Sequence, residues 1–151
     1  MTTATEERRI TGERKVGSSI LVGAIAGLAG GLLFGTMMAM MNFLPMVGML
    51  VGVENSIVGF VVHMVISAFL GGIFGLVVSQ LSGYSLGTAI VAGAVYGAAW
   101  WILGALILMP LLLGMTQMIL VIGSAQWMSL IGHLVYGVVT GLVFFYLRQR
   151  F

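Results

Sequence analysis

Two histidines are the residues of this chain best able to bind a ligand in an apolar setting. His63 and His133 each lie inside a long apolar run, about eight residues from its start. In a helix that spacing is about 12 Å. An ionisable side chain at such a depth in a membrane marks a functional site, and imidazole nitrogens are ligands of haem iron and of copper. The pair therefore predicts a ligand or metal site inside a membrane.

Each histidine has a serine one helical turn away on one side and a glycine one turn away on the other. A serine hydroxyl there would fix the tautomer of the imidazole ring, and a glycine would leave a gap for a flat cofactor. We predict paired ligation of one b-type haem, and less readily of copper. Proton handling, a quinone contact and hydrogen bonds that only join helices are the alternatives. The four flanking residues are Ser67, Ser129, Gly59 and Gly137.

The composition excludes a soluble domain. The chain has 151 residues, of which 60% are hydrophobic and 7% charged, with a mean hydropathy of +1.17, whereas soluble domains carry about 25% charged residues. The net charge of +2 lies in the two tails and so does not indicate nucleic-acid binding. With no Cys, no Asp and only Glu54 between the tails, thiolate sites and paired-carboxylate catalysis are excluded. We predict a non-enzymatic protein.

The elements that must position the histidines are four apolar runs, each long enough to cross about 30 Å of hydrocarbon as a helix. The sequence therefore predicts an all-α, polytopic membrane four-helix bundle. The expected spans are 18–44, 56–78, 86–109 and 126–147.

Every Lys and Arg lies before Val16 or after Leu147. By the positive-inside rule, both termini are expected on the cytoplasmic side of the cell membrane, with residues 1–17 as a flexible juxtamembrane tail and 18–151 as the transmembrane domain. The connections 45–55 and 110–125 then face outward. Both are apolar and too short to cross, which predicts short helices that lie in the interface or fold back between the spans.

The two halves of the chain resemble each other. A shift of 70 residues lays His63 on His133, and a shift of 65 lays Pro45 on Pro110. The sequence thus predicts two tandem two-helix hairpin repeats, about 18–80 and 84–147, related by a pseudo-two-fold axis along the membrane normal. Glycine, alanine and serine recur at every fourth position in each span, which indicates close helix packing.

Methionine and glutamate add two further expectations. Apart from Met1, every methionine lies in the expected outer half or outer loops, where thioethers would suit Cu(I) or an adaptable contact surface. Glu54 is expected to cap the second span, because a carboxylate is favoured at a helix N-terminus.

The segments Trp100–Met115 and Ser129–Gly137 resemble those of an uncharacterised family of small four-span prokaryotic membrane proteins. The resemblance implies a prokaryotic cytoplasmic membrane and brings no activity with it.

Together these observations predict a subunit or accessory component of a membrane assembly that holds a haem or metal between His63 and His133. Its expected partners are the lipid bilayer and either other membrane subunits or further copies of itself. The alternatives are a small transporter or channel, with the histidines as gate or proton site, and a purely structural subunit.

Overall fold

The structure is a computed structural model that describes residues 2–81 and 83–150, with side chains from Lys15 onward. No strand occurs among these residues, and four of their helices are long and apolar enough to cross a membrane. The prediction of an all-α, four-span membrane protein is thereby confirmed. The spans are Lys15–Met40, Ser56–Val78, Leu86–Leu112 and Ser124–Leu147.

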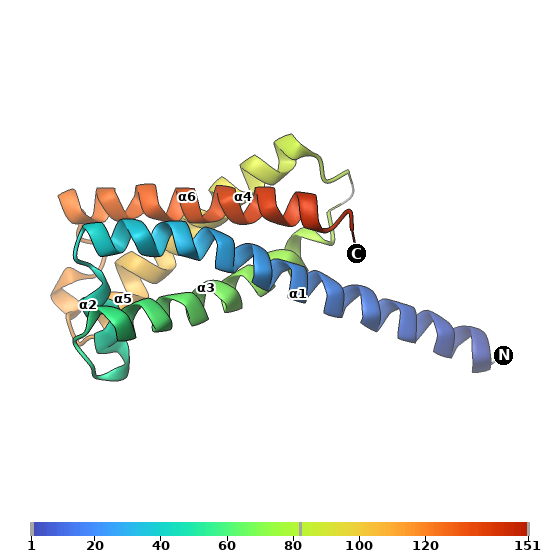
Figure 1. The fold of residues 1–151 in the computed structure, drawn as a ribbon, viewed down its shortest axis with the longest axis horizontal. Helices are drawn as coiled ribbons and strands as arrows, with labels where there is room; N and C mark the ends of the chain where they lie inside the picture. The colour runs from blue at the N-terminus through green and yellow to red at the C-terminus, as the bar shows by residue number, and fades with distance from the viewer. Residues whose placement is uncertain (1, 82, 151) are drawn as a thin grey trace.

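The long helices are α1 (Thr2–Met40), α3 (Ser56–Val78), α4 (Leu86–Trp100) and α6 (Ser124–Leu147). A π-helix, η2 (Trp101–Leu108), and then α5 (Met109–Leu112) continue α4. The short elements are α2 (Leu44–Gly48), η1 (Met49–Val51) and η3 (Thr116–Met118). α2 and α5 gather at the end of the bundle away from both termini (Figure 1), and we call this end the loop end.

Glycines bring the helices of each hairpin into backbone contact. In the α1–α3 hairpin, a Cβ added to Gly27 or Gly71 would collide with main-chain atoms of the facing helix. In the α4–α6 hairpin the same holds for Gly93, Gly137 and Gly141. The predicted small-residue stripes therefore lie at the helix contacts, where membrane helices gain packing energy from close approach. The two hairpins use the same kind of contact, and the internal repeat itself stays a prediction.

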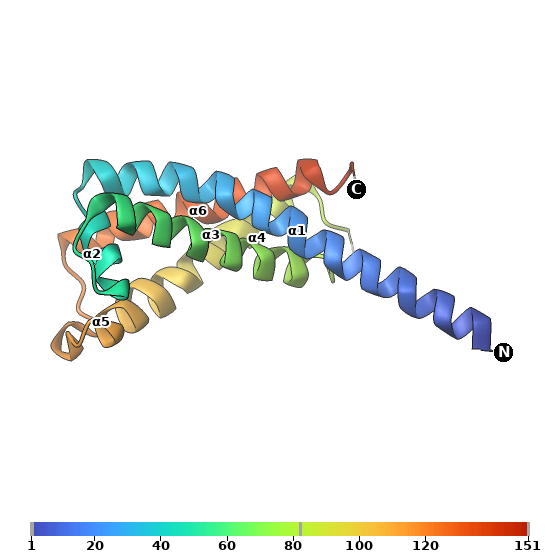
Figure 2. The ribbon, with the colours of Figure 1, turned by 60° about the horizontal axis from the view of Figure 1, so that its bottom comes forward.

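The four helices are not arranged with equal contacts on all sides. The backbones of α1 and α6 pack closely along each other, whereas those of α3 and α4, the pair that the predicted repeat would make equivalent, lie farther apart and are joined by side chains. Towards the loop end the chain from η2 to α5 also turns away from α6 (Figure 2). The bundle is therefore closed on its α1–α6 side and open on its α3–η2 side.

The π-helix and Pro110 account for the departure of this segment. In η2 the Met109 N–H bonds to the Gly104 carbonyl, five residues back, which gives a wider turn than an α-helix. Pro110 has no N–H to donate to the preceding turn. The Leu106 carbonyl in that turn accepts instead from the Leu120 N–H at 3.0 Å. The connection after α5 thus returns to η2 at Leu120, and whether it lies in the membrane interface stays a prediction.

The loop before α3 differs from expectation in its cap. The side chain of Asn55 accepts hydrogen bonds from the Ile57 and Val58 N–H groups at 2.9 and 3.2 Å. The prediction that Glu54 caps this helix is therefore wrong. Asn55 is the residue immediately before the first turn, and its short side chain reaches the free N–H groups there, whereas Glu54 is exposed.

The helix α1 begins at Thr2 and includes most of the segment expected as a juxtamembrane tail. Between Thr2 and Lys15 the sequence has no proline and only one glycine, Gly12. Few residues there oppose continuation of the helix from the span.

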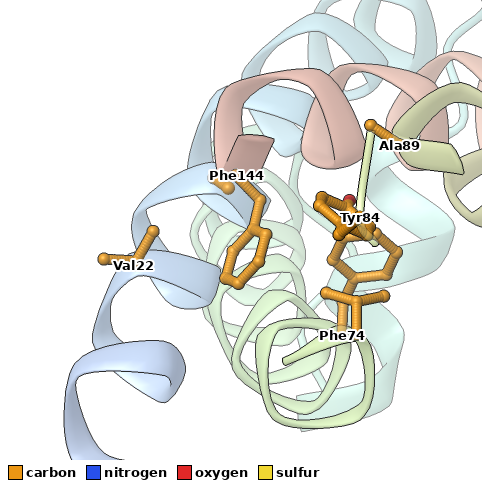
Figure 3. Packing of buried hydrophobic residues seen from close by; sticks show 7 residues of the cluster. Val22, Phe74, Tyr84, Ala89 and Phe144 are labelled. Carbon is orange, nitrogen blue, oxygen red and sulfur yellow. The ribbon is translucent and has the colours of Figure 1, made fainter. Parts of the chain in front are cut away.

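The half of the bundle near the termini is filled by an aromatic cluster. Phe74 and Phe144 are each 1% exposed and meet edge to face, with ring centroids 6.0 Å apart. Figure 3 shows Phe144 and Tyr84 directed towards the cluster from different segments. Burial raises the pKa of Tyr84 to about 12 although Arg148 lies over its ring, so this phenol stays neutral. This half has a solid core.

Candidate functional site

A cavity of about 440 Å³ lies in the half of the bundle near the loop end. It is bounded by the loop-end parts of α1, α2, α3, η2, α5 and α6, and it occupies the space that the departure of η2 leaves open. Its walls are aliphatic, aromatic and methionine side chains, with no charged side chain among the lining residues. Phe69 and Leu112 on its rim are 67% and 68% exposed. The cavity therefore reaches the surface of the bundle beside α3 and α5.

Both predicted histidines line this cavity. His63 comes from α3 and is buried, and His133 comes from α6 and is half-buried. The ring of Phe34, from α1, meets both imidazoles edge to face, with centroid distances of 5.3 Å to His63 and 4.8 Å to His133. Three helices thus place their side chains together at the inner end of the cavity.

Each imidazole is held by a main-chain carbonyl. His63 Nε2 lies 2.9 Å from the Gly31 carbonyl oxygen, and His133 Nδ1 lies 2.8 Å from that of Ser129. A carbonyl oxygen only accepts, so in each ring the nitrogen beside it carries the hydrogen. The hydroxyls of Ser67 and Ser129 approach the same nitrogens at 3.4 and 3.3 Å. The serines lie where the sequence predicted, but the shorter contacts that fix the tautomers are to carbonyls.

The two flanking glycines serve helix packing. A Cβ on Gly59 would collide with the carbonyl of Leu44 in α2, and a Cβ on Gly137 would collide with that of Gly93 in α4. The space beside these glycines is filled by backbone, so the gap expected there for a flat cofactor is absent. The open space lies instead in front of the rings, towards η2.

A haem between the two histidines does not fit these side chains. Ligation by both imidazoles requires the macrocycle to lie between them with the iron bonded to one nitrogen of each. The Phe34 ring lies against both His63 and His133 and is itself buried against Gly132, so it occupies the space between the two imidazoles. The cavity lining also offers no cation for the carboxylates that a haem carries.

Metal binding has little support from the surrounding side chains. Among the residues described, no group of three or more His, Cys, Asp or Glu side chains could hold a metal ion. Three methionines, Met38, Met46 and Met109, do line the cavity. Thioethers are polarizable and make favourable contacts with aromatic rings, so these walls suit a ring-shaped ligand.

Two tyrosine side chains make hydrogen bonds between helices next to the cavity residue Leu70 and at Ser67. Tyr96 donates from its hydroxyl to the Leu70 carbonyl at 2.6 Å, and Tyr136 donates to the Ser67 carbonyl at 2.8 Å. The Tyr96 ring also packs on Phe74, with centroids 5.1 Å apart. These contacts join helices across the bundle.

Several parts of the site could not be read from the sequence. Trp100 lines the cavity. Phe34 and Gln126 also line it, but neither carries a signal that distinguishes it from other residues of its helix. The sequence also does not indicate the π-helix η2. Its only related feature is Pro110, which interrupts the helical hydrogen bonds just after η2.

No family model, curated protein or solved structure matches this chain.

Proposed function

We propose that this integral membrane protein is a non-enzymatic component that binds an apolar, ring-bearing small molecule taken sideways from the bilayer. The ligand lies in the cavity between α3 and η2, with Trp100 and the methionines against its faces and the histidines at its inner end. The protein's role is to hold or present this molecule within the membrane, and its partners are lipid and other membrane subunits or further copies of itself.

The observation that supports this proposal is the apolar cavity between α3 and η2, which both intramembrane histidines line. Small-molecule sites are concave and mostly apolar, typically about 300–1,000 Å³, with a few polar groups that fix orientation. At about 440 Å³ the cavity lies in that range. A ring system with one or two polar atoms matches its walls, whereas a strongly charged solute does not.

The packing favours binding over conduction. A transporter or channel needs a path through the bundle, and the aromatic cluster around Phe74 and Phe144 fills the half near the termini. The tyrosine hydrogen bonds lie between that cluster and the cavity. In a purely structural subunit, close packing of η2 on α3 would add stabilising contacts, and the cavity between them forgoes those contacts.

The membrane orientation is part of the proposal. The cationic residues that precede Val16 and follow Leu147 favour cytoplasmic termini in a prokaryotic cell membrane. The loop end and its cavity then lie in the outer leaflet, and ligand enters from that leaflet between α3 and η2.

Fluorescence quenching in detergent tests the proposal. Bromine quenches tryptophan on contact, so 1-bromonaphthalene is expected to quench the Trp100 emission saturably when it enters the cavity. Trp101 and Trp127 stack on each other, with centroids 6.0 Å apart, outside the cavity lining. Removal of Trp100 by the Trp100→Phe substitution should therefore remove most of the saturable quenching.

Quenching that rises linearly with the probe, or that is unchanged in Trp100→Phe, would count against a site at the cavity. It would indicate that bromonaphthalene only dissolves in the detergent around the protein.

A further inference from the structure

We infer that the ligand of this cavity is an aromatic alcohol, such as a phenol, naphthol or hydroquinone, that donates its hydroxyl hydrogen to His63 or His133. This inference rests on the proposed function and specifies its ligand class. It follows from which ring nitrogens carry hydrogen and which remain open.

The second nitrogen of each ring is a hydrogen-bond acceptor. Because His63 Nε2 and His133 Nδ1 donate to the Gly31 and Ser129 carbonyls, a neutral ring leaves a lone pair on His63 Nδ1 and on His133 Nε2. Neither of these atoms has a hydrogen-bond partner among the residues described. The site thus offers two acceptors and no imidazole donor.

Neither acceptor nitrogen is completely buried. In the described part of the chain, no side-chain nitrogen or oxygen is both fully buried and without a partner. The two free nitrogens are therefore not enclosed by protein, and their rings line the cavity. An unpaired acceptor in an apolar site costs free energy that a ligand donor recovers, so the cavity selects for a hydroxyl group on an apolar ring.

A donor ligand fits these observations better than a metal ion. A lone pair on a neutral imidazole also binds metals, but no third His, Asp or Glu joins the pair in the described chain. The cavity is also far larger than one ion needs, and its remaining walls are apolar. A quinone in its oxidised form has only acceptor oxygens, so it would leave both nitrogens unpaired.

Three probes of equal ring size test this inference by quenching of tryptophan at pH 7. They are 4-bromo-1-naphthol, its methyl ether 1-bromo-4-methoxynaphthalene, and 1-bromonaphthalene. We expect the naphthol to bind about tenfold more tightly than its methyl ether, because the ether keeps the shape but has lost the donor.

The variants His63→Phe and His133→Phe keep an aromatic ring beside Phe34 and remove the acceptor. Because either nitrogen can accept, the variant that carries both substitutions should reduce the naphthol preference to about twofold or less. Binding of 1-bromonaphthalene, which does not depend on either nitrogen, reports in the same variants that the cavity is intact.

Equal affinity of the naphthol and its ether for the unmodified protein would overturn the inference while leaving the proposed function standing. A naphthol preference that persists in the variant carrying both substitutions would also overturn it. Failure of all three probes to bind the unmodified protein would reject the proposed function together with the inference.

Discussion

Replacement of Gly71 by alanine is expected to destabilise the bundle strongly, whereas the same change at its neighbour Gly72 is not. A Cβ on Gly71 would collide with the Gly23 carbonyl and lie 2.6 Å from the Gly27 Cα. These are main-chain atoms in the middle of a helix, so α1 and α3 would have to separate. At Gly72 the nearest atom to an added Cβ would be Ile20 Cγ2, at 3.4 Å.

We expect Gly71→Ala to cost about 3 kcal/mol, because overpacking of a tight contact costs about 1–3 kcal/mol and backbone cannot repack as side chains do. For a chain of this length, such a loss lowers Tm by an amount on the order of 10 °C. Thermal unfolding in detergent measures the shift, with Gly72→Ala as the matched control, expected within about 2 °C of the parent. Equal shifts for the two variants would show that α1 and α3 are not in backbone contact at Gly71.

Filling of the cavity is expected to weaken ligand binding strongly without loss of stability. Gly104 lies in η2 and lines the cavity, and a Cβ there would meet only a side-chain atom of Trp100, at 3.9 Å. The ring introduced by Gly104→Phe therefore has room to extend into the space that the ligand needs. We expect the affinity for 1-bromonaphthalene to fall at least about tenfold, equivalent to about 1.4 kcal/mol of lost binding energy.

The matched control is Gly87→Phe, near the start of α4. Gly87 is exposed and outside the cavity lining, and its nearest contact would be Ser85 Oγ, at 3.8 Å. The same quenching titration is expected to give the parent affinity for this variant. Unchanged binding in Gly104→Phe, with its fold intact, would place the ligand somewhere other than this cavity.

The sequence predicted the spans well because membrane helices have a simple requirement. A segment that crosses hydrocarbon must satisfy its backbone internally and be apolar over about 20 residues, and both properties are visible in one stretch of sequence. Small residues every fourth position likewise indicated the packing faces, which the contacts of Gly71 and Gly137 confirm. The face of a helix that carries its small residues follows from the spacing of those residues along that helix alone, so it can be predicted from the sequence.

The parts that sequence could not predict depend on pairs of distant segments. The carbonyl that orients His63 belongs to Gly31 in another helix, and every residue has a carbonyl, so no residue type marks it. Asn55 and Glu54 are both acceptable capping residues by type, and the local backbone decides between them. The predicted two-fold symmetry would make the α3–α4 packing equal to the α1–α6 packing, but the backbones of α3 and α4 lie farther apart and the α3–η2 side is open.

The most direct measurement of the central claim is the position of bromine in crystals of the protein grown with 1-bromonaphthalene. Anomalous diffraction at the bromine absorption edge locates the halogen without assumptions about the ligand's orientation. If the ligand binds in the cavity, a bromine peak is expected among three side chains that line it, Trp100, Met109 and His133. Bromine peaks confined to the lipid-facing surfaces of the helices, with none inside the cavity, would contradict the proposal.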